Sequence, residues 1–173
     1  MATDYDAEFL DFAEASRTRL RRAAFLMCGD WDHASDITQE ALVRLYLAWP
    51  RIDKGAGLAS YARRTVISIA IDRARKKSSS ELPDATLGTD SSAAAADDIE
   101  GVVDRITILN ALARLAPRQR ACVVLRYYED LSVAEVARVL GCREGTVKSQ
   151  TARGLDTLRE HLGTLELTEE AAS

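Results

Sequence analysis

The sequence has few of the residues that enzymes, metal proteins and disulfide-bonded proteins use. Its three cysteines, Cys28, Cys122 and Cys142, are odd in number and scattered, so we expect free thiols. The two histidines, at positions 33 and 161, give no metal-ligand spacing and little acid–base chemistry near neutral pH. No glycine-rich phosphate loop is present. The sequence therefore predicts no catalytic residues, no metal, no cofactor and no small-molecule substrate.

Long apolar segments are also absent. The apolar runs are interrupted by charged residues, and none approaches the ~20 residues needed to span a bilayer. The N-terminus, MATDYDAEFLDFAEAS, is acidic where a signal peptide would be basic and then apolar. The apolar fraction of 47% nevertheless supports a packed interior. We therefore expect a cytoplasmic protein without membrane insertion.

Prolines are rare, and no stretch alternates for long in the manner of a strand. Helical periodicity predicts helices over residues 5–28, 29–50, 58–77, 100–115, 117–129, 132–139 and 144–162. The second should be capped near Asp30 or Asp32 and end before Pro50. The segment TVISIAI, residues 65–71, favours a strand by local propensity, but cationic turns flank it and it has no partner strand. We expect an all-α fold.

Charge is segregated along the chain, although the net charge is only −4. Residues 58–77 contain six cations and one acid, whereas residues 78–101 contain six acids and no cation. The segment SSSELPDATLGTDSSAAAADD, residues 78–98, is polar and small, which is typical of a linker. The sequence thus predicts two small helical domains, 1–77 and 102–165, a flexible acidic linker, 78–101, and an acidic tail, 166–173.

A helix-turn-helix is predicted within LSVAEVARVLGCREGTVKSQTARGLDTLR, residues 131–159. Ser132 can cap the first helix, and Glu135 three residues later completes a capping box. Ala137 is small enough for a close helix approach, Gly141 supplies the sharp turn, and Val147 should point back into the core. Each element alone is a weak signal, but together they are a strong one.

The second helix of this motif presents a narrow face suited to the major groove of DNA. Lys and Arg there can read guanine edges or hold phosphates, and the backbone amides of Gly145 and Thr146 at the helix start can meet a phosphate. The alternative is a solvated helix face that happens to be cationic. The residues of the face are Lys148, Ser149, Ala152 and Arg153.

A polar face is also predicted on the helix over residues 29–50. Asp36, Gln39 and Glu40 have i, i+3 and i+4 spacing, so they form a comb suited to a basic, helical partner. Taken alone, such a comb is more often a solvated surface.

Together these segments resemble a known family. Residues 131–159 and HASDITQEALVRLYLAWP, residues 33–50, are similar to sigma factors of bacterial RNA polymerase, in the extracytoplasmic-function class and of the actinobacterial sigma-E-like type. The resemblance covers about residues 5–77 and 102–162. It implies an alternative sigma factor that binds core RNA polymerase and directs promoter recognition, with region 2 over 1–77 and region 4 over 102–165. The family also allows an anti-sigma factor as a further partner.

The resemblance implies roles for individual residues. Those on or beside the polymerase-docking face would be Asp36, Gln39, Glu40 and Arg44. The segment PRIDKGAGLAS, residues 50–60, resembles the loop that accepts a flipped base of the −10 element. The following helix would lie along that DNA with Tyr61, Arg63, Arg64 and Ser68. The −35 element would be bound by Thr146, Lys148, Ser149, Ala152 and Arg153.

The chain departs from the family pattern in places. Ser68 stands where many members have Asn, and Gln150 where many have Arg. Glu144 would repel phosphate unless it caps the helix or pairs with Lys148. The acidic linker takes the place of the segment that in this family occupies polymerase channels, where it can imitate a polyanion.

Other interpretations remain open from the sequence. One is a stand-alone helix-turn-helix regulator that binds operator DNA as a two-fold dimer. Another is an interaction module that only sequesters a partner. A free protein inhibited by packing of its two domains is a further alternative.

Overall fold

The computed structural model describes the backbone of residues 4–55, 57–80 and 99–172, and the side chains of residues 4–55, 57–79 and 105–163. Within these ranges every regular element is helical and none is a strand, which confirms the predicted all-α fold class. The TVISIAI segment lies inside a helix. No helix in this part of the chain is both long and apolar enough to cross a membrane. Most of the predicted acidic linker, residues 81–98, lies outside the described residues.

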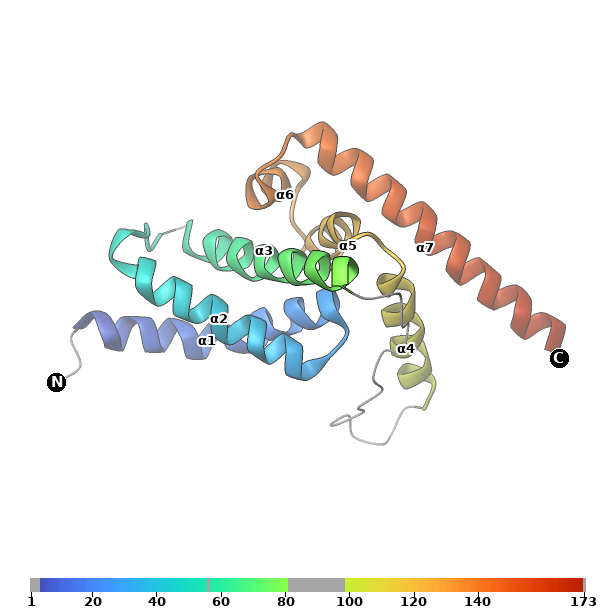
Figure 1. Ribbon diagram of the computed structural model, residues 1–173, viewed down its shortest axis with the longest axis horizontal. Helices are drawn as coiled ribbons and strands as arrows, with labels where there is room; N and C mark the ends of the chain where they lie inside the picture. The colour runs from blue at the N-terminus through green and yellow to red at the C-terminus, as the bar shows by residue number, and fades with distance from the viewer. Residues whose placement is uncertain (1–3, 56, 81–98, 173) are drawn as a thin grey trace.

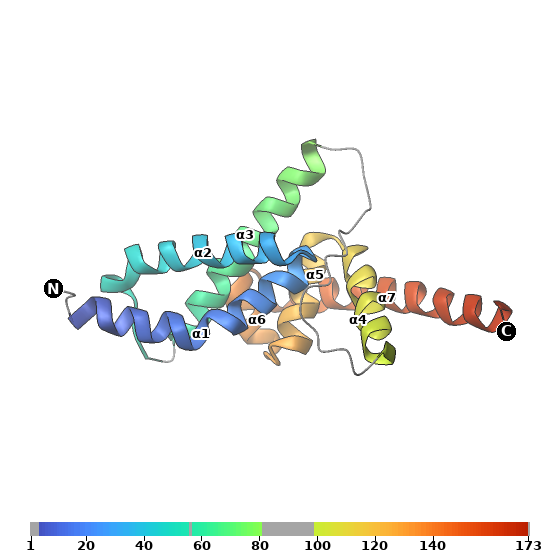
Figure 2. The same cartoon turned by 90° about the horizontal axis from the view of Figure 1, so that it is seen from below.

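The N-terminal half consists of α1 (Asp4–Cys28), α2 (Trp31–Ala48), the short 3-10 helix η1 (Trp49–Arg51) and α3 (Gly57–Ser80). Helices α1 and α2 lie side by side, and α3 crosses them (Figures 1 and 2). The turn between α1 and α2 uses Gly29, whose φ of 74° is a left-handed value that glycine adopts easily. Asp30 then caps α2 as predicted, because its carboxylate accepts a 2.7 Å hydrogen bond from the backbone N–H of His33.

The C-terminal half consists of α4 (Ile99–Ala113), α5 (Pro117–Val123), η2 (Val124–Tyr128), α6 (Val133–Leu140) and α7 (Glu144–Ala172). Proline at the first position of α5 costs no backbone hydrogen bond, since that N–H would have no partner inside the helix. Helix α7 continues through the segment predicted to be a tail and well past the predicted helix end near residue 162.

The predicted helix over residues 117–129 is not one regular α-helix. After α5 the chain forms a single π-helical turn, η2, in which the N–H of Glu129 donates to the carbonyl of Val124 at 3.1 Å. Asp130 then adopts a left-handed φ of 54° before α6 begins. Such wide turns redirect a chain within a helix. Here the turn places Glu129, which is only 4% exposed, in the interior of the molecule.

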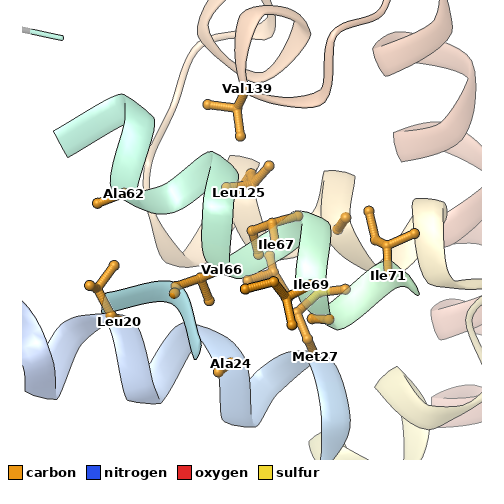
Figure 3. Close-up of a cluster of buried hydrophobic side chains, with 14 of the residues drawn as sticks. Leu20, Ala24, Met27, Ala62, Val66, Ile67, Ile69, Ile71, Leu125 and Val139 are labelled. Carbon is orange, nitrogen blue, oxygen red and sulfur yellow. The ribbon is translucent and has the colours of Figure 1, made fainter. Parts of the chain in front are cut away.

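Helix α3 is buried on two sides, because it packs against α1 on one side and against the C-terminal half on the other. Val66 lies on the side of α1, near Leu20, while Ile67 lies beside Leu125 of η2 (Figure 3). All four side chains are buried and belong to one continuous apolar core that contains residues from both halves. An amphipathic surface helix buries only one stripe of its side chains. The second buried stripe of α3 therefore marks a contact between the halves.

Candidate functional site

The helix-turn-helix has the predicted local geometry. Ser132 Oγ accepts a 3.2 Å hydrogen bond from the N–H of Glu135, whose carboxylate accepts one of 2.7 Å from the N–H of Ser132. The hydrogen bond from the backbone N–H of Ser132 is the largest cause that lowers the pKa of Glu135. Gly141 has a φ of 62°, the left-handed value required at the turn, and Val147 is fully buried. The prediction of a capping box, glycine turn and inward valine is confirmed.

The outer face of α7 is open. Lys148, Ser149, Ala152 and Arg153 are all exposed, and Val147 and Thr151 are buried on the opposite face. Four residues of the predicted −35 set thus share one accessible strip of helix, in which Lys148 lies four positions before Ala152 and Ser149 four positions before Arg153. The strip could follow a groove of DNA and contact both bases and phosphates.

The start of α7 differs from the prediction for backbone amides. The N–H of Thr146 donates to the carbonyl of Arg143 at 3.0 Å, so this amide is not open to a phosphate. The carbonyl of Thr146 in turn accepts a 3.1 Å hydrogen bond from the hydroxyl of Ser149. A phosphate contact at Thr146 would therefore have to come from its partly exposed side chain.

The predicted −10 residues on α3 lie in different surroundings. Tyr61, Arg64 and Ser68 are exposed, and 40% of the surface of Tyr61 is accessible to solvent. Arg63 is not free, because its Nε donates a 2.9 Å hydrogen bond to the carboxylate of Glu129. Arg64 lies against the turn of the helix-turn-helix, where its guanidinium is 3.6 Å from the position of a β-carbon built on Gly141. The cationic start of α3 therefore faces the C-terminal half.

The loop predicted to accept a flipped base, residues 50–60, is tied to α1. Lys54 forms an ion pair with Glu8 and lies over the ring of Trp49, 5.5 Å from its centroid. The carboxylate of Asp53 accepts a 3.0 Å hydrogen bond from the N–H of Gly55, which tightens the turn. These contacts hold the first half of the loop against the aromatic cluster of α1 and η1.

The comb on α2 divides into two parts. Asp36 and Gln39 are exposed, as a docking surface requires. Glu40 instead accepts hydrogen bonds from Arg44 at 2.6 Å and from Arg73 of α3 at 2.7 Å. The bond from Arg73 is the largest cause that lowers the pKa of Glu40, and Arg44 adds to it. Glu40 and Arg44 thus pair with each other beside the exposed face.

Two apolar side chains extend this face and were not predicted. Val43 is 59% exposed and Leu47 is 72% exposed. Val43 follows Gln39 by four residues and Asp36 by seven, and Leu47 follows Val43 by four, so both continue the same side of α2. Large apolar side chains with this exposure often mark an interaction surface when they are contiguous with polar partners. The i, i+4 spacing of positions 39, 43 and 47 is the sequence signal that would have found them.

Glu129 is a third residue that the sequence pattern did not indicate. Its carboxylate accepts hydrogen bonds from Arg63 and from Arg19 of α1, the latter at 3.0 Å. Neither arginine is near Glu129 in the sequence. Only the fold brings the three residues together.

The thiols support the prediction of free cysteines, since all three are unpaired. Burial raises the pKa of Cys122 to about 11 and also raises the pKa of Cys28. A buried thiol with a raised pKa is a poor nucleophile. Over the described residues no group of three or more potential metal ligands comes together.

Comparison with protein families finds two matches in sequence order. The family described as Sigma-70 region 2 matches residues 12–80, and the family described as Sigma-70, region 4 matches residues 105–158. The first match contains α2 and α3 with their exposed faces. The second contains the helix-turn-helix.

Curated relatives have similar lengths and carry matching names. The RNA polymerase sigma-E factor of Streptomyces avermitilis is 39% identical over 92% of this chain and 89% of its own length. The RNA polymerase sigma-E factor of Streptomyces coelicolor is 37% identical over 90% and 88%. The ECF RNA polymerase sigma factor SigW of Bacillus subtilis is 31% identical over 92% and 90%.

Solved structures share the fold at lower sequence identity. The sigma factor RpoE of Bartonella quintana, solved in complex with the anti-sigma factor NepR, has a TM-score of 0.71 at 22% identity and covers 90% of this chain and 97% of its own. CnrH, solved with the cytosolic domain of CnrY, has a TM-score of 0.67 at 18% identity, with coverages of 90% and 88%.

Proposed function

The chain belongs to the sigma factors of RNA polymerase, in the extracytoplasmic-function class and with a sigma-E-like sequence, and we propose that it divides promoter recognition among three surfaces. It is an alternative sigma factor that binds core RNA polymerase and directs transcription from promoters. The observation that carries this function is the presence, in one chain and in order, of a region 2 match and a region 4 match. A stand-alone operator-binding regulator would account for the second match and leave the first unexplained.

The first proposed surface is the outward side of α2, which would bind polymerase. Asp36 and Gln39 supply exposed polar groups, and Val43 and Leu47 supply exposed apolar area beside them. A polar comb followed by an apolar patch suits a helical partner with a basic and an apolar portion. Glu40 and Arg44 support this surface through their ion pair, and Arg73 ties it to α3.

The second proposed surface is the start of α3 with the preceding loop, which would bind the −10 element. Tyr61 offers an aromatic ring on which an unpaired base can stack. Arg63 and Arg64 offer charge to the backbone phosphates, and Ser68 a hydroxyl one helical turn further along. The third surface is the exposed strip of α7, where Lys148, Ser149, Ala152 and Arg153, with Thr146 at its edge, would bind the −35 element.

We further propose the setting in which the protein acts. As a transcription initiation factor it would act in the cytoplasm, where core polymerase lies, and would have no enzymatic activity of its own. The two structural neighbours named above were solved with an anti-sigma factor or with the cytosolic domain of CnrY. On this basis we propose that an anti-sigma factor also regulates this chain.

Co-purification with core polymerase tests the function. A tagged full-length chain should retain core polymerase from a bacterial lysate, and the reconstituted complex should start transcription at defined positions on genomic fragments. A chain that binds operator DNA alone and leaves core polymerase unbound would instead be a stand-alone regulator.

A further inference from the structure

The carboxylate of Glu129 lies between two arginines of the opposite half of the molecule. Its side chain is 1% exposed, and one oxygen, Oε2, is 2.9 Å from Nη2 of Arg19 and 2.9 Å from Nε of Arg63. Arg19 is on α1 and Arg63 on α3, whereas Glu129 follows the π-helical turn of the C-terminal half. Three charged groups separated by up to 110 residues thus share one site.

Burial makes this cluster specific to the packed arrangement. A carboxylate taken out of water is tolerated only where charged or hydrogen-bonding partners replace the water. The two ion pairs recorded for Glu129 are both with the N-terminal half, so separation of the halves would break both and expose the carboxylate. The cluster therefore exists in the packed form alone.

A second polar contact between the halves lies at the C-terminal end of α1. Arg120 of α5 donates a 2.5 Å hydrogen bond from Nη1 to the carbonyl of Met27. The last turn of α1 contains no basic residue of its own, and a cation there stabilises the free carbonyls at the end of a helix. Burial of the guanidinium lowers the pKa of Arg120. The two halves also meet in the apolar core, where Ile67 of α3 lies beside Leu125 (Figure 3).

The packed arrangement affects the two proposed DNA surfaces differently. Arg63 is only 19% exposed and its guanidinium is bound to Glu129, while Arg64 lies against the turn at Gly141. By contrast, Lys148 and Arg153 on α7 are exposed. The −10 surface is thus partly covered by the C-terminal half, and the −35 surface is open.

We propose that Glu129 is an intramolecular latch that holds the free protein closed and competes with promoter DNA for Arg63. An arginine binds a carboxylate and a phosphate through the same donors, so the carboxylate of Glu129 takes the place that a backbone phosphate would occupy. Arg19 strengthens the latch from a position outside the predicted DNA surfaces. Loading onto polymerase and promoter would replace these contacts and release Arg63. The DNA part of the proposal rests on the proposed function, and the closure itself does not.

Small-angle scattering of the full-length chain tests the closure. A compact chain of this length has a radius of gyration of about 16 Å, and separated halves should raise the parent's measured value by about 2 Å or more. We expect that rise in Glu129→Gln. The matched control is Asp156→Asn, which removes one carboxylate from the same half at an exposed surface pair with Arg159. An unchanged radius in Glu129→Gln would overturn the latch.

A second variant keeps the test decisive if Glu129→Gln fails to fold. Arg19→Ala removes one of the two partners from a side chain that is 59% exposed, so it disturbs little packing. Arg19→Ala should increase the radius of gyration, as Glu129→Gln should, while its circular dichroism spectrum stays helical. A folded Arg19→Ala chain with the parent's radius would count against the latch as directly as the first variant.

The competition between Glu129 and promoter DNA for Arg63 can be tested without polymerase. The measurement is the binding of a labelled single DNA strand that carries the −10 element. If the closed form holds about nine-tenths of the parent molecules, release should tighten binding about tenfold in Arg19→Ala and leave Asp156→Asn unchanged. Expansion without tighter binding would overturn the competition with DNA and retain the closure. Failure of the parent to support transcription with core polymerase would refute the proposed function and leave the scattering result intact.

Discussion

Arg73 of α3 donates a 2.7 Å hydrogen bond to the carboxylate of Glu40 on α2, and Arg44 donates another from one turn further along α2. The bond from Arg73 connects the helix proposed to dock on polymerase with the helix proposed to follow the −10 DNA, and the bond from Arg44 lies within α2. Glu40 therefore acts in positioning these two helices, while Asp36 and Gln39 remain exposed for a partner.

The lowered pKa of Glu40 makes its contribution to stability depend on pH. A carboxyl group whose pKa is lower in the folded protein stabilises the fold above its unfolded pKa, ~4.3, and loses that contribution as pH falls through the folded pKa. Because the side chain of Glu40 is 36% exposed, solvent screening limits the contribution to less than ~1 kcal/mol.

Substitution Glu40→Gln should therefore lower the free energy of unfolding at pH 7 and have a smaller effect at pH 3.5. Urea unfolding at both pH values measures this. Glu14→Gln, on the exposed surface of α1, is the control for the loss of one surface carboxylate. An equal loss at both pH values in Glu40→Gln would mean that the ionised carboxylate is not the source of the effect.

Docking on polymerase should depend on Asp36 and Gln39. The double variant Asp36→Ala with Gln39→Ala should bind core polymerase about tenfold more weakly, which corresponds to ~1.4 kcal/mol. Its stability should be unchanged, because both side chains are exposed. The control is Asp11→Ala with Glu14→Ala, an exposed pair at the same spacing on α1. Equal affinity of the docking variant and the parent would remove this face from the interface.

The turn at Gly141 should disfavour any residue with a side chain. A left-handed φ of 62° costs a residue with a β-carbon ~1–2 kcal/mol, and Arg64 lies 3.6 Å from the added carbon. Gly141→Ala should therefore lower the melting temperature, by about 2–4 °C for each kcal/mol in a chain of this size. The comparison variant is Gly145→Ala, where the added carbon meets nothing within 4 Å and alanine favours the helix. A Gly141→Ala chain as stable as Gly145→Ala would contradict the strain at this turn.

Local geometry was predictable from the sequence, and the contacts between the halves were not. The cap at Asp30, the capping box of Ser132 and Glu135, and the turn at Gly141 depend on neighbours within four residues, so the pattern of residue types was sufficient. The ion pair of Arg44 with Glu40 has the same short spacing. Arg63 was assigned to DNA by the resemblance to sigma factors, and that resemblance says nothing about a carboxylate 66 residues away.

The π-helical turn explains why Glu129 was missed. Residues 117–129 have helical periodicity, and a regular α-helix there would give no reason to place an acidic residue in the interior. The wide turn at Val124–Tyr128 and the left-handed Asp130 change the direction of the chain and bury Glu129. A local pattern does not contain the packing that favours such a turn.

The two cations of the α7 strip should act differently at promoters. If Arg153 makes a bidentate contact with a guanine, Arg153→Ala should cost ~1–3 kcal/mol and relax the preference at one position of the −35 element. If Lys148 holds a phosphate, Lys148→Ala should weaken all promoters alike and lower the salt dependence of binding by about one unit of slope.

Holoenzyme binding to a library of −35 variants at several salt concentrations separates these effects. Arg159→Ala, an exposed cation further along α7 that pairs with Asp156, is the control for loss of positive charge. Unchanged sequence preference in both Arg153→Ala and Lys148→Ala would remove these side chains from the reading surface.

Mapping of transcription start sites tests the central claim most directly. Core polymerase alone and core polymerase reconstituted with the full-length chain are given the same genomic fragments, and the 5′ ends of the transcripts are sequenced. We predict new start sites that appear only with the chain, each preceded by two shared sequence blocks centred near −10 and −35, as two separate reading surfaces require. Start sites identical to those of core polymerase alone would contradict the assignment of this chain as a promoter-recognition factor.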